Sequence, residues 1–154
     1  MLASALMYDS PRRPRLGLIA RMDTDLKILI IAGTAILTYG FLLGIPMSQA
    51  RQKAAQAPRH LVNTHLESLM AGGILLALSI ALAFADMASW LSNLTALILA
   101  VGVALPIVGG TLHWRQNVDD PFATKPPGFY FQAAGGVIGV LGMVILLVGV
   151  LAGL

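Results

Sequence analysis

Four long apolar stretches, separated by short polar connections, are the feature that most limits what this chain can fold into. The first runs through 28–45 and comes close to the roughly 20 apolar residues that a helix needs to cross a bilayer. Of 154 residues, 57% are hydrophobic and only 11% are charged, whereas soluble domains carry about 25% charged residues. We therefore expect an all-α integral membrane protein built as a four-helix bundle, spanning the inner or plasma membrane several times.

Turn-forming and capping residues give approximate bounds for the four helices. The expected spans are about Leu26–Met47, Thr64–Ala85, Leu94–His113, and Phe129 to the C-terminus. Asp23, Thr24 and Asp25 suit the start of the first helix, and Pro46 is expected to end it. Pro106 is expected to kink the third helix. Trp90, in the connection 86–93, is expected to anchor the chain at the membrane interface.

The sequence divides into an N-terminal interfacial arm, residues 1–26, and a four-transmembrane-helix domain, residues 27–154. Met22 is an alternative start, which would remove most of the arm. Lys and Arg number five on each side of the expected topology, so the positive-inside rule does not orient the chain. Because the net charge is only +3 and no long basic block occurs, no nucleic-acid partner is expected. The absence of cysteine excludes disulfides, thiolate metal ligands and iron–sulfur clusters.

The stretch 59–73 places ionisable residues where the second helix enters the membrane. An ionisable side chain at that depth costs free energy unless it is paired, so His65 and Glu67 are candidates for a functional site. Thr64 and Glu67 also fit a capping box, in which each side chain satisfies a free backbone donor, and this explains Glu67 without function. The topology places the following polar residues on the same membrane face: His60, His65, Glu67, His113, Trp114, Arg115, Asp119, Asp120, Tyr130 and Gln132.

The glycines near His65 suggest a surface for a flat cofactor. Leu69, Gly72 and Gly73 share a helix face with His65, and the two glycines leave that face sterically open. A haem plane could lie there with His65 as its axial ligand. Two alternatives stay open: His65 is simply hydrated at the interface, or a hard metal binds to some of His60, His65, Glu67, His113 and the two aspartates of 114–128.

The last helix carries a stripe of glycines on one face. Its members are Gly135, Gly139, Gly142, Gly149 and Gly153. Small residues in such a stripe let two helix backbones approach closely in a bilayer. We expect this face to pack against a partner helix, either within the bundle or across a subunit interface.

The pattern that opens the second helix resembles a known family. His65, Leu66, Glu67 and Gly72, in the second of four short membrane helices, resemble the hydroxylaminobenzene mutases and, more distantly, styrene oxide isomerase. The likeness in layout covers about residues 27–154, and 84–86 is similar to the corresponding turn of the isomerase. The resemblance implies a homotrimeric membrane isomerase with haem b between protomers, iron bound by His65, and Gly72 and Gly73 beside the cofactor.

The same resemblance implies a reaction and a substrate class. The iron acts as a Lewis acid in an intramolecular rearrangement of a small apolar aromatic oxygenated substrate, an epoxide or an arylhydroxylamine. The family has Asn where this chain has Ala71, and it has a polar third helix where this chain is apolar. Tyr130, Gln132 and His113 are therefore the candidate catalytic residues. The alternatives are a haem-binding or sensing protein without catalysis, and a cofactor-free membrane scaffold.

Overall fold

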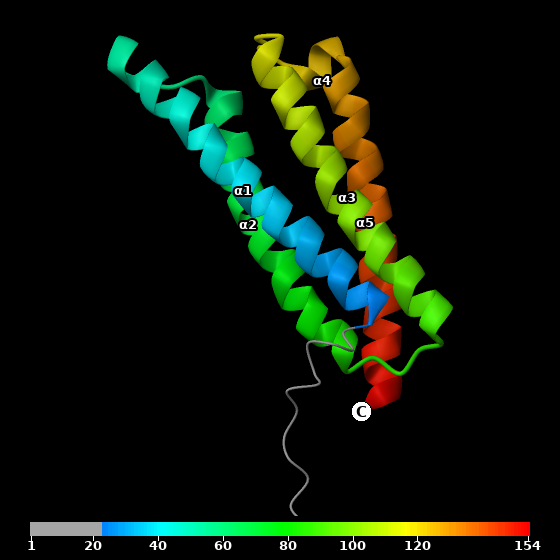
Figure 1. Cartoon of the computed structure of the whole chain (residues 1–154). Coiled ribbons are helices and arrows are strands. Elements are labelled where there is room, and N and C mark those ends of the chain that lie inside the picture. The colour runs from blue at the N-terminus through cyan, green and yellow to red at the C-terminus, as the bar shows by residue number, and fades with distance from the viewer. Residues whose placement is uncertain (1–22) are drawn as a thin grey trace, which may run out of the picture.

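The computed structural model describes residues 23–154, which form four long helices and one short one (Figure 1). Their bounds are α1 Thr24–Lys53, α2 Arg59–Ala83, α3 Ser89–Arg115, α4 Pro121–Thr124 and α5 Pro127–Gly153. The four long helices are each long and apolar enough to cross a membrane. The prediction of an all-α, multi-pass membrane protein is confirmed. Residues 1–22, which contain most of the expected N-terminal arm and the alternative start Met22, lie outside the described part of the chain.

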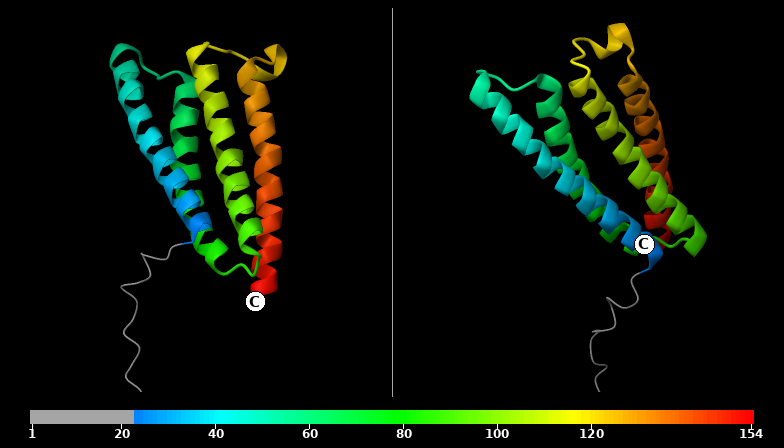
Figure 2. Two further views of the ribbon diagram at one scale, coloured as in Figure 1. Left: turned by 45° about the vertical axis from the view of Figure 1, so that its right-hand side comes forward. Right: turned by 45° about the horizontal axis from the view of Figure 1, so that its top comes forward.

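The long helices associate as two antiparallel pairs, α1 with α2 and α3 with α5 (Figure 2). The pairs converge near the α2–α3 connection and separate toward the end that carries α4, as Figure 1 shows. The buried apolar core lies at the converging end. It consists of Leu29, Leu75, Leu82, Ala96, Leu99 and Leu146.

Glycines let the backbones of the two helices in each pair pack closely. In the α1–α2 pair, a Cβ added to Gly72 would lie 2.8 Å from Gly33 O. In the α3–α5 pair, a Cβ added to Gly102 would lie 2.6 Å from the Gly139 Cα. Lipid tails are as apolar as these side chains, so close packing of small residues is what holds the helices together. The glycine stripe of α5 thus packs within the chain: Gly135, Gly139 and Gly142 contact α3, and Gly149 and Gly153 contact the α2–α3 connection.

A buried carboxylate also ties α1 to α3. Asp25 is only 8% exposed, and its carboxylate accepts hydrogen bonds from the Leu26 N–H and from the Ser92 hydroxyl. The expectation that Asp25 lies in the first turn of the helix is confirmed. Its tertiary contact to Ser92 was not predicted.

Three of the expected helix bounds differ from the structure by several residues. Pro46 does not end the first helix, since α1 continues to Lys53. A proline removes one backbone hydrogen bond but its φ is compatible with a helix, and membrane helices tolerate it. The second helix begins at Arg59, directly after Pro58, rather than at Thr64.

The earlier start of α2 overturns the capping-box prediction. Thr64 lies inside the helix, where its hydroxyl donates to His60 O at 2.8 Å. Glu67 is therefore not in the first turn and caps nothing.

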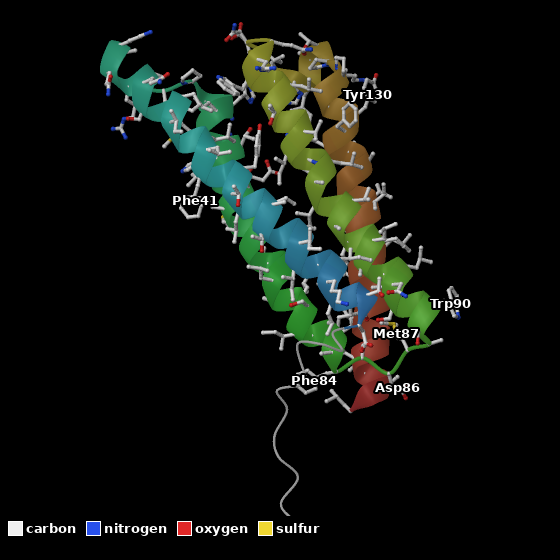
Figure 3. All side chains as sticks on the ribbon, viewed as in Figure 1. Phe41, Phe84, Asp86, Met87, Trp90 and Tyr130 are labelled. Atoms are coloured by element: carbon white, nitrogen blue, oxygen red, sulfur yellow. The ribbon has the colours of Figure 1, made fainter. Side chains whose placement is uncertain are left out.

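The third helix likewise begins at Ser89 rather than Leu94, which places Trp90 in its first turn, projecting outward (Figure 3).

Two neighbouring glycines of α5 test the packing of α3 on α5. A Cβ on Gly135 would overlap the Pro106 ring, whereas a Cβ on Gly136 meets nothing within 4 Å. We expect Gly135→Ala to lower the free energy of unfolding by about 1–3 kcal/mol through overpacking. Gly136→Ala should leave it unchanged or slightly raised, because alanine favours helix. Unfolding in mixed detergent followed by circular dichroism measures both, and equal stabilities would contradict this packing.

Candidate functional site

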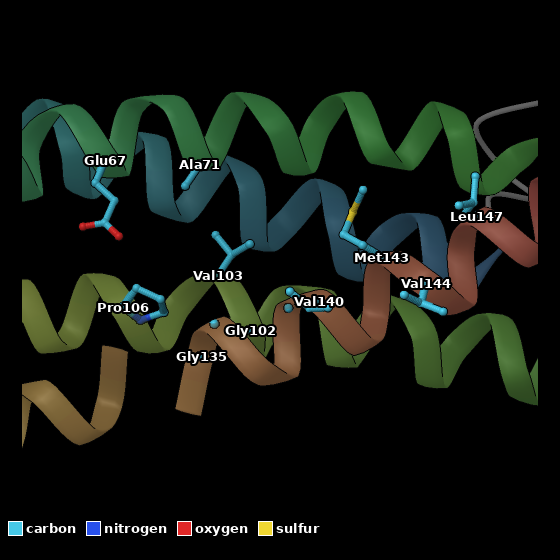
Figure 4. Close-up of a pocket in the computed structure, with 12 residues that line it drawn as sticks. Glu67, Ala71, Gly102, Val103, Pro106, Gly135, Val140, Met143, Val144 and Leu147 are labelled. Carbon is cyan, nitrogen blue, oxygen red and sulfur yellow. The ribbon is translucent and has the colours of Figure 1, made fainter. Parts of the chain in front are cut away.

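The Glu67 side chain points into the space between α2 and the α3–α5 pair (Figure 4). Ala71 follows one turn later on the same face of α2. Glu67 is half-buried, and within residues 23–154 no group forms a hydrogen bond or an ion pair with its carboxylate. The structure thus leaves an unpaired acidic group in a membrane-spanning helix, which is an arrangement typical of functional sites.

An apolar cavity of about 530 Å³ extends from Glu67 along α3 and α5. We call it the apolar groove. Its walls include Ala71 of α2, Val103 and Pro106 of α3, and Gly136 and Met143 of α5 (Figure 4). Within residues 23–154, Glu67 is the only charged residue that lines it. The groove therefore suits an apolar body with a polar group at one end.

A second cavity, of about 420 Å³, lies between the first turns of α2, the end of α3, α4 and the start of α5. We call it the polar pocket. Its polar lining residues are Arg59, His60, Asn63, Thr64, Glu67, His113, Asp119, Asp120 and Gln132. Of the residues that the structure describes, Glu67 alone lines both the polar pocket and the apolar groove. It therefore stands at the boundary between a charged region and an apolar one.

Two of the three histidines meet beside the polar pocket. The rings of His60 and His113 are 5.5 Å apart in an edge-to-face arrangement. His60 Nε2 donates to Val118 O at 2.7 Å, which ties the start of α2 to the loop after α3. His113 is 1% exposed and packs against Gly128, and its Nε2 has no hydrogen-bond partner among residues 23–154.

His65 lies on a different side of α2 from Glu67. Its Nδ1 donates to Gly40 O of α1 at 2.8 Å. It lines a cavity of about 570 Å³ together with Arg51, Arg59 and Leu66; we call this cavity the His65 pocket. Because the hydrogen bond occupies Nδ1, the Nε2 lone pair is left to bind a metal.

The two glycines expected beside a haem have different surroundings. Gly72 is buried against Leu37 and Gly33 of α1. Gly73 is exposed, and a Cβ there would meet nothing within 4 Å. Of these two glycines, only Gly73 is accessible to a flat ligand within one chain.

The three candidate catalytic residues are not all brought together. His113 and Gln132 line the polar pocket, with Gln132 packed against Gly109. Tyr130 is 61% exposed and points away from the bundle (Figure 3). Among residues 23–154, no cluster of three His, Asp or Glu side chains has the geometry to hold a metal ion. The hard-metal alternative therefore has no support in the described geometry.

Sequence reasoning missed one polar contact close to this region. The Tyr39 hydroxyl lies 2.7 Å from the Thr111 hydroxyl, which itself donates to Ile107 O at 2.7 Å. This contact joins α1 to α3. Hydroxyl groups inside the apolar stretches indicate such contacts, since a buried hydroxyl needs a hydrogen-bond partner. The sequence does not identify the partner.

Comparison with known protein families, with curated proteins and with solved structures finds no match to this chain. The function is therefore argued from the site itself.

The structure predicts that Glu67 contributes little to folding. Because its carboxylate neither caps α2 nor bonds to another described group, Glu67→Gln should change the free energy of unfolding by less than about 0.5 kcal/mol. Unfolding of the purified protein in mixed detergent measures this. A loss of about 1 kcal/mol or more, as for a helix cap, would restore the capping role.

Proposed function

We propose that this protein is a membrane isomerase that binds haem b through His65 and rearranges a small aromatic oxygenated substrate. The observation that carries the proposal is the hydrogen bond from His65 Nδ1 to Gly40 O. Histidines that bind a metal through one ring nitrogen usually donate the other to a carbonyl or carboxylate, which fixes the tautomer and the ring orientation. This arrangement supports the likeness of 65–72 to the haem-binding isomerases.

The rest of the His65 pocket fits the chemistry of haem b. Arg51 and Arg59 line it, and their positive charges match the two carboxylates that haem carries. Met47 and Leu66 supply apolar surface. The exposed Gly73 leaves room beside α2. These residues would hold the cofactor, and its iron would supply a Lewis acid toward a substrate oxygen.

The positions of the two cavities favour a homo-oligomer. The His65 pocket lies on the α1–α2 side, whereas the apolar groove lies between α2 and α5. A haem held by His65 would therefore not reach the groove of its own chain. An assembly in which the His65 face of one copy covers the groove of the next would bring cofactor and substrate together. We propose a homotrimer, the assembly that the resemblance implies.

The groove would hold the aromatic body of the substrate away from water. Gln132 and His113, in the adjoining polar pocket, are the neighbouring groups able to donate a hydrogen bond to a substrate oxygen. Ala71 offers only a methyl group at the position where the resembled family has an amide. These roles make epoxides and arylhydroxylamines the substrates to test.

A haem-binding membrane protein without catalysis is the second candidate. The observation that favours it is the groove lining, which has no polar side chain other than Glu67. Such a protein would retain haem and leave both substrate classes unchanged.

Haem ligation is tested with two histidine variants. The detergent-purified wild type, from cells supplied with haem precursor, should show a Soret band. His65→Ala should lose it because the iron ligand is gone. His60→Ala is the matched control and should keep it, since His60 bonds to Val118 O and does not line the His65 pocket. A colourless wild type, or a Soret band retained in His65→Ala, would overturn the assignment.

Turnover is tested by blocking the apolar groove. Gly136 lines the groove with open space beside it, whereas the neighbouring Val137 is 73% exposed and does not line it. Gly136→Phe should lower the rearrangement rate by at least about tenfold through loss of substrate space while retaining haem. Val137→Phe should keep the wild-type rate. Chromatography of the products measures both, and an unaffected rate in Gly136→Phe would place the reaction elsewhere.

A further inference from the structure

The Glu67 carboxylate needs a partner that the described chain does not supply. A carboxyl group in a membrane-spanning segment is stable when it is protonated or when a cation pairs with it. In the described part of the chain, Arg59 is the one Lys or Arg residue that lines the polar pocket, and it forms no ion pair with Glu67. The unpaired carboxylate is therefore available to a ligand.

The charges around Glu67 favour a cationic ligand. Three carboxylates line the polar pocket, those of Glu67, Asp119 and Asp120, against the single guanidinium of Arg59. Such an excess of negative charge attracts a positive group. The same excess of negative charge would repel an anion.

Among the described residues, the lining of the apolar groove contains no side-chain hydrogen-bond donor, and Glu67 supplies carboxylate oxygens at its end. The groove thus suits a molecule with an apolar body whose polar end is a cation.

We propose that the apolar groove and the polar pocket together bind one lipophilic cation. Its protonated amine or quaternary ammonium head pairs with Glu67, and its apolar body lies along α5 between Gly136 and Met143. The two cavities meet only at Glu67, so a single molecule with a charged head and an apolar tail satisfies both.

Arg59 and Asn63 line both the polar pocket and the His65 pocket, but His65 itself lines neither the groove nor the polar pocket. The inference therefore does not rest on haem binding by His65, and a bound cation would compete with the proposed substrate for the groove.

Two probes of matched shape and opposite charge test the proposal. Octyltrimethylammonium and octyl sulfate share the same tail, and calorimetric titration in a nonionic detergent, with empty micelles subtracted, measures the binding of each. The wild type should bind the ammonium at least about tenfold more tightly than the sulfate, because only the ammonium can pair with the Glu67 carboxylate. Equal affinities would overturn the proposal, since an apolar tail alone would then explain the binding.

Three variants assign the two parts of the site. Glu67→Gln should weaken binding of the ammonium about tenfold, and Gly136→Phe should weaken it by filling the groove. Val137→Phe should bind as the wild type does. Circular dichroism and gel filtration check that each variant is folded. If a folded Glu67→Gln keeps the wild-type affinity, the groove takes only an acyl chain or a second copy of the chain, and the proposal fails.

The His65→Ala variant separates this inference from the haem proposal. It should lose the Soret band and still bind octyltrimethylammonium with the wild-type affinity, because His65 lines neither the groove nor the polar pocket. Loss of ammonium binding in a folded His65→Ala protein would show that the cation site depends on the haem site and would overturn the inference as stated.

Discussion

Close contacts through glycine hold the helices in two pairs, and the sites of this protein depend on that arrangement. At Gly33 and Gly72, and again at Gly102 and Gly139, no side chain separates the two backbones. In a bilayer the helices gain little from burying apolar surface, so such contacts decide which helices pair closely. α2 packs mainly on α1, and α3 packs mainly on α5. The space between the two pairs therefore contains the Glu67 carboxylate, the apolar groove and the polar pocket.

The second helix carries His65 and Glu67 on different faces. His65 and Glu67 are two residues apart, which on a helix directs their side chains to different sides. His65 turns toward α1 and bonds to Gly40 O, while Glu67 turns toward α3 and α5. The proposed cofactor site and the proposed cation site therefore lie on different faces of α2, and Arg59 and Asn63 line both the His65 pocket and the polar pocket. In an oligomer, the two sites of neighbouring copies would face each other.

The four apolar helices could be predicted from the sequence, but the direction of each side chain around its helix could not. The four apolar stretches were sufficient for the fold class, and the glycine stripe of α5 for close packing. Two local patterns gave wrong predictions. Pro46 lies inside α1, because a membrane helix can contain a proline. Thr64 and Glu67 do not form a capping box, because α2 begins at Arg59, directly after Pro58. Contacts such as Asp25 with Ser92 depend on how helices distant in sequence are placed, which no local pattern contains.

The proposed cation site requires that the groove beside Glu67 is accessible. Because the chain has no cysteine, a single introduced thiol measures this accessibility directly. Ala71→Cys would place a thiol in the groove, and Leu75→Cys, at a position 0% exposed, is the buried reference. With a membrane-permeant maleimide in detergent, Ala71→Cys should react much faster than Leu75→Cys, and octyltrimethylammonium should slow that reaction. Equal, slow labelling of both thiols, or labelling of Ala71→Cys that the ammonium does not change, would contradict the account.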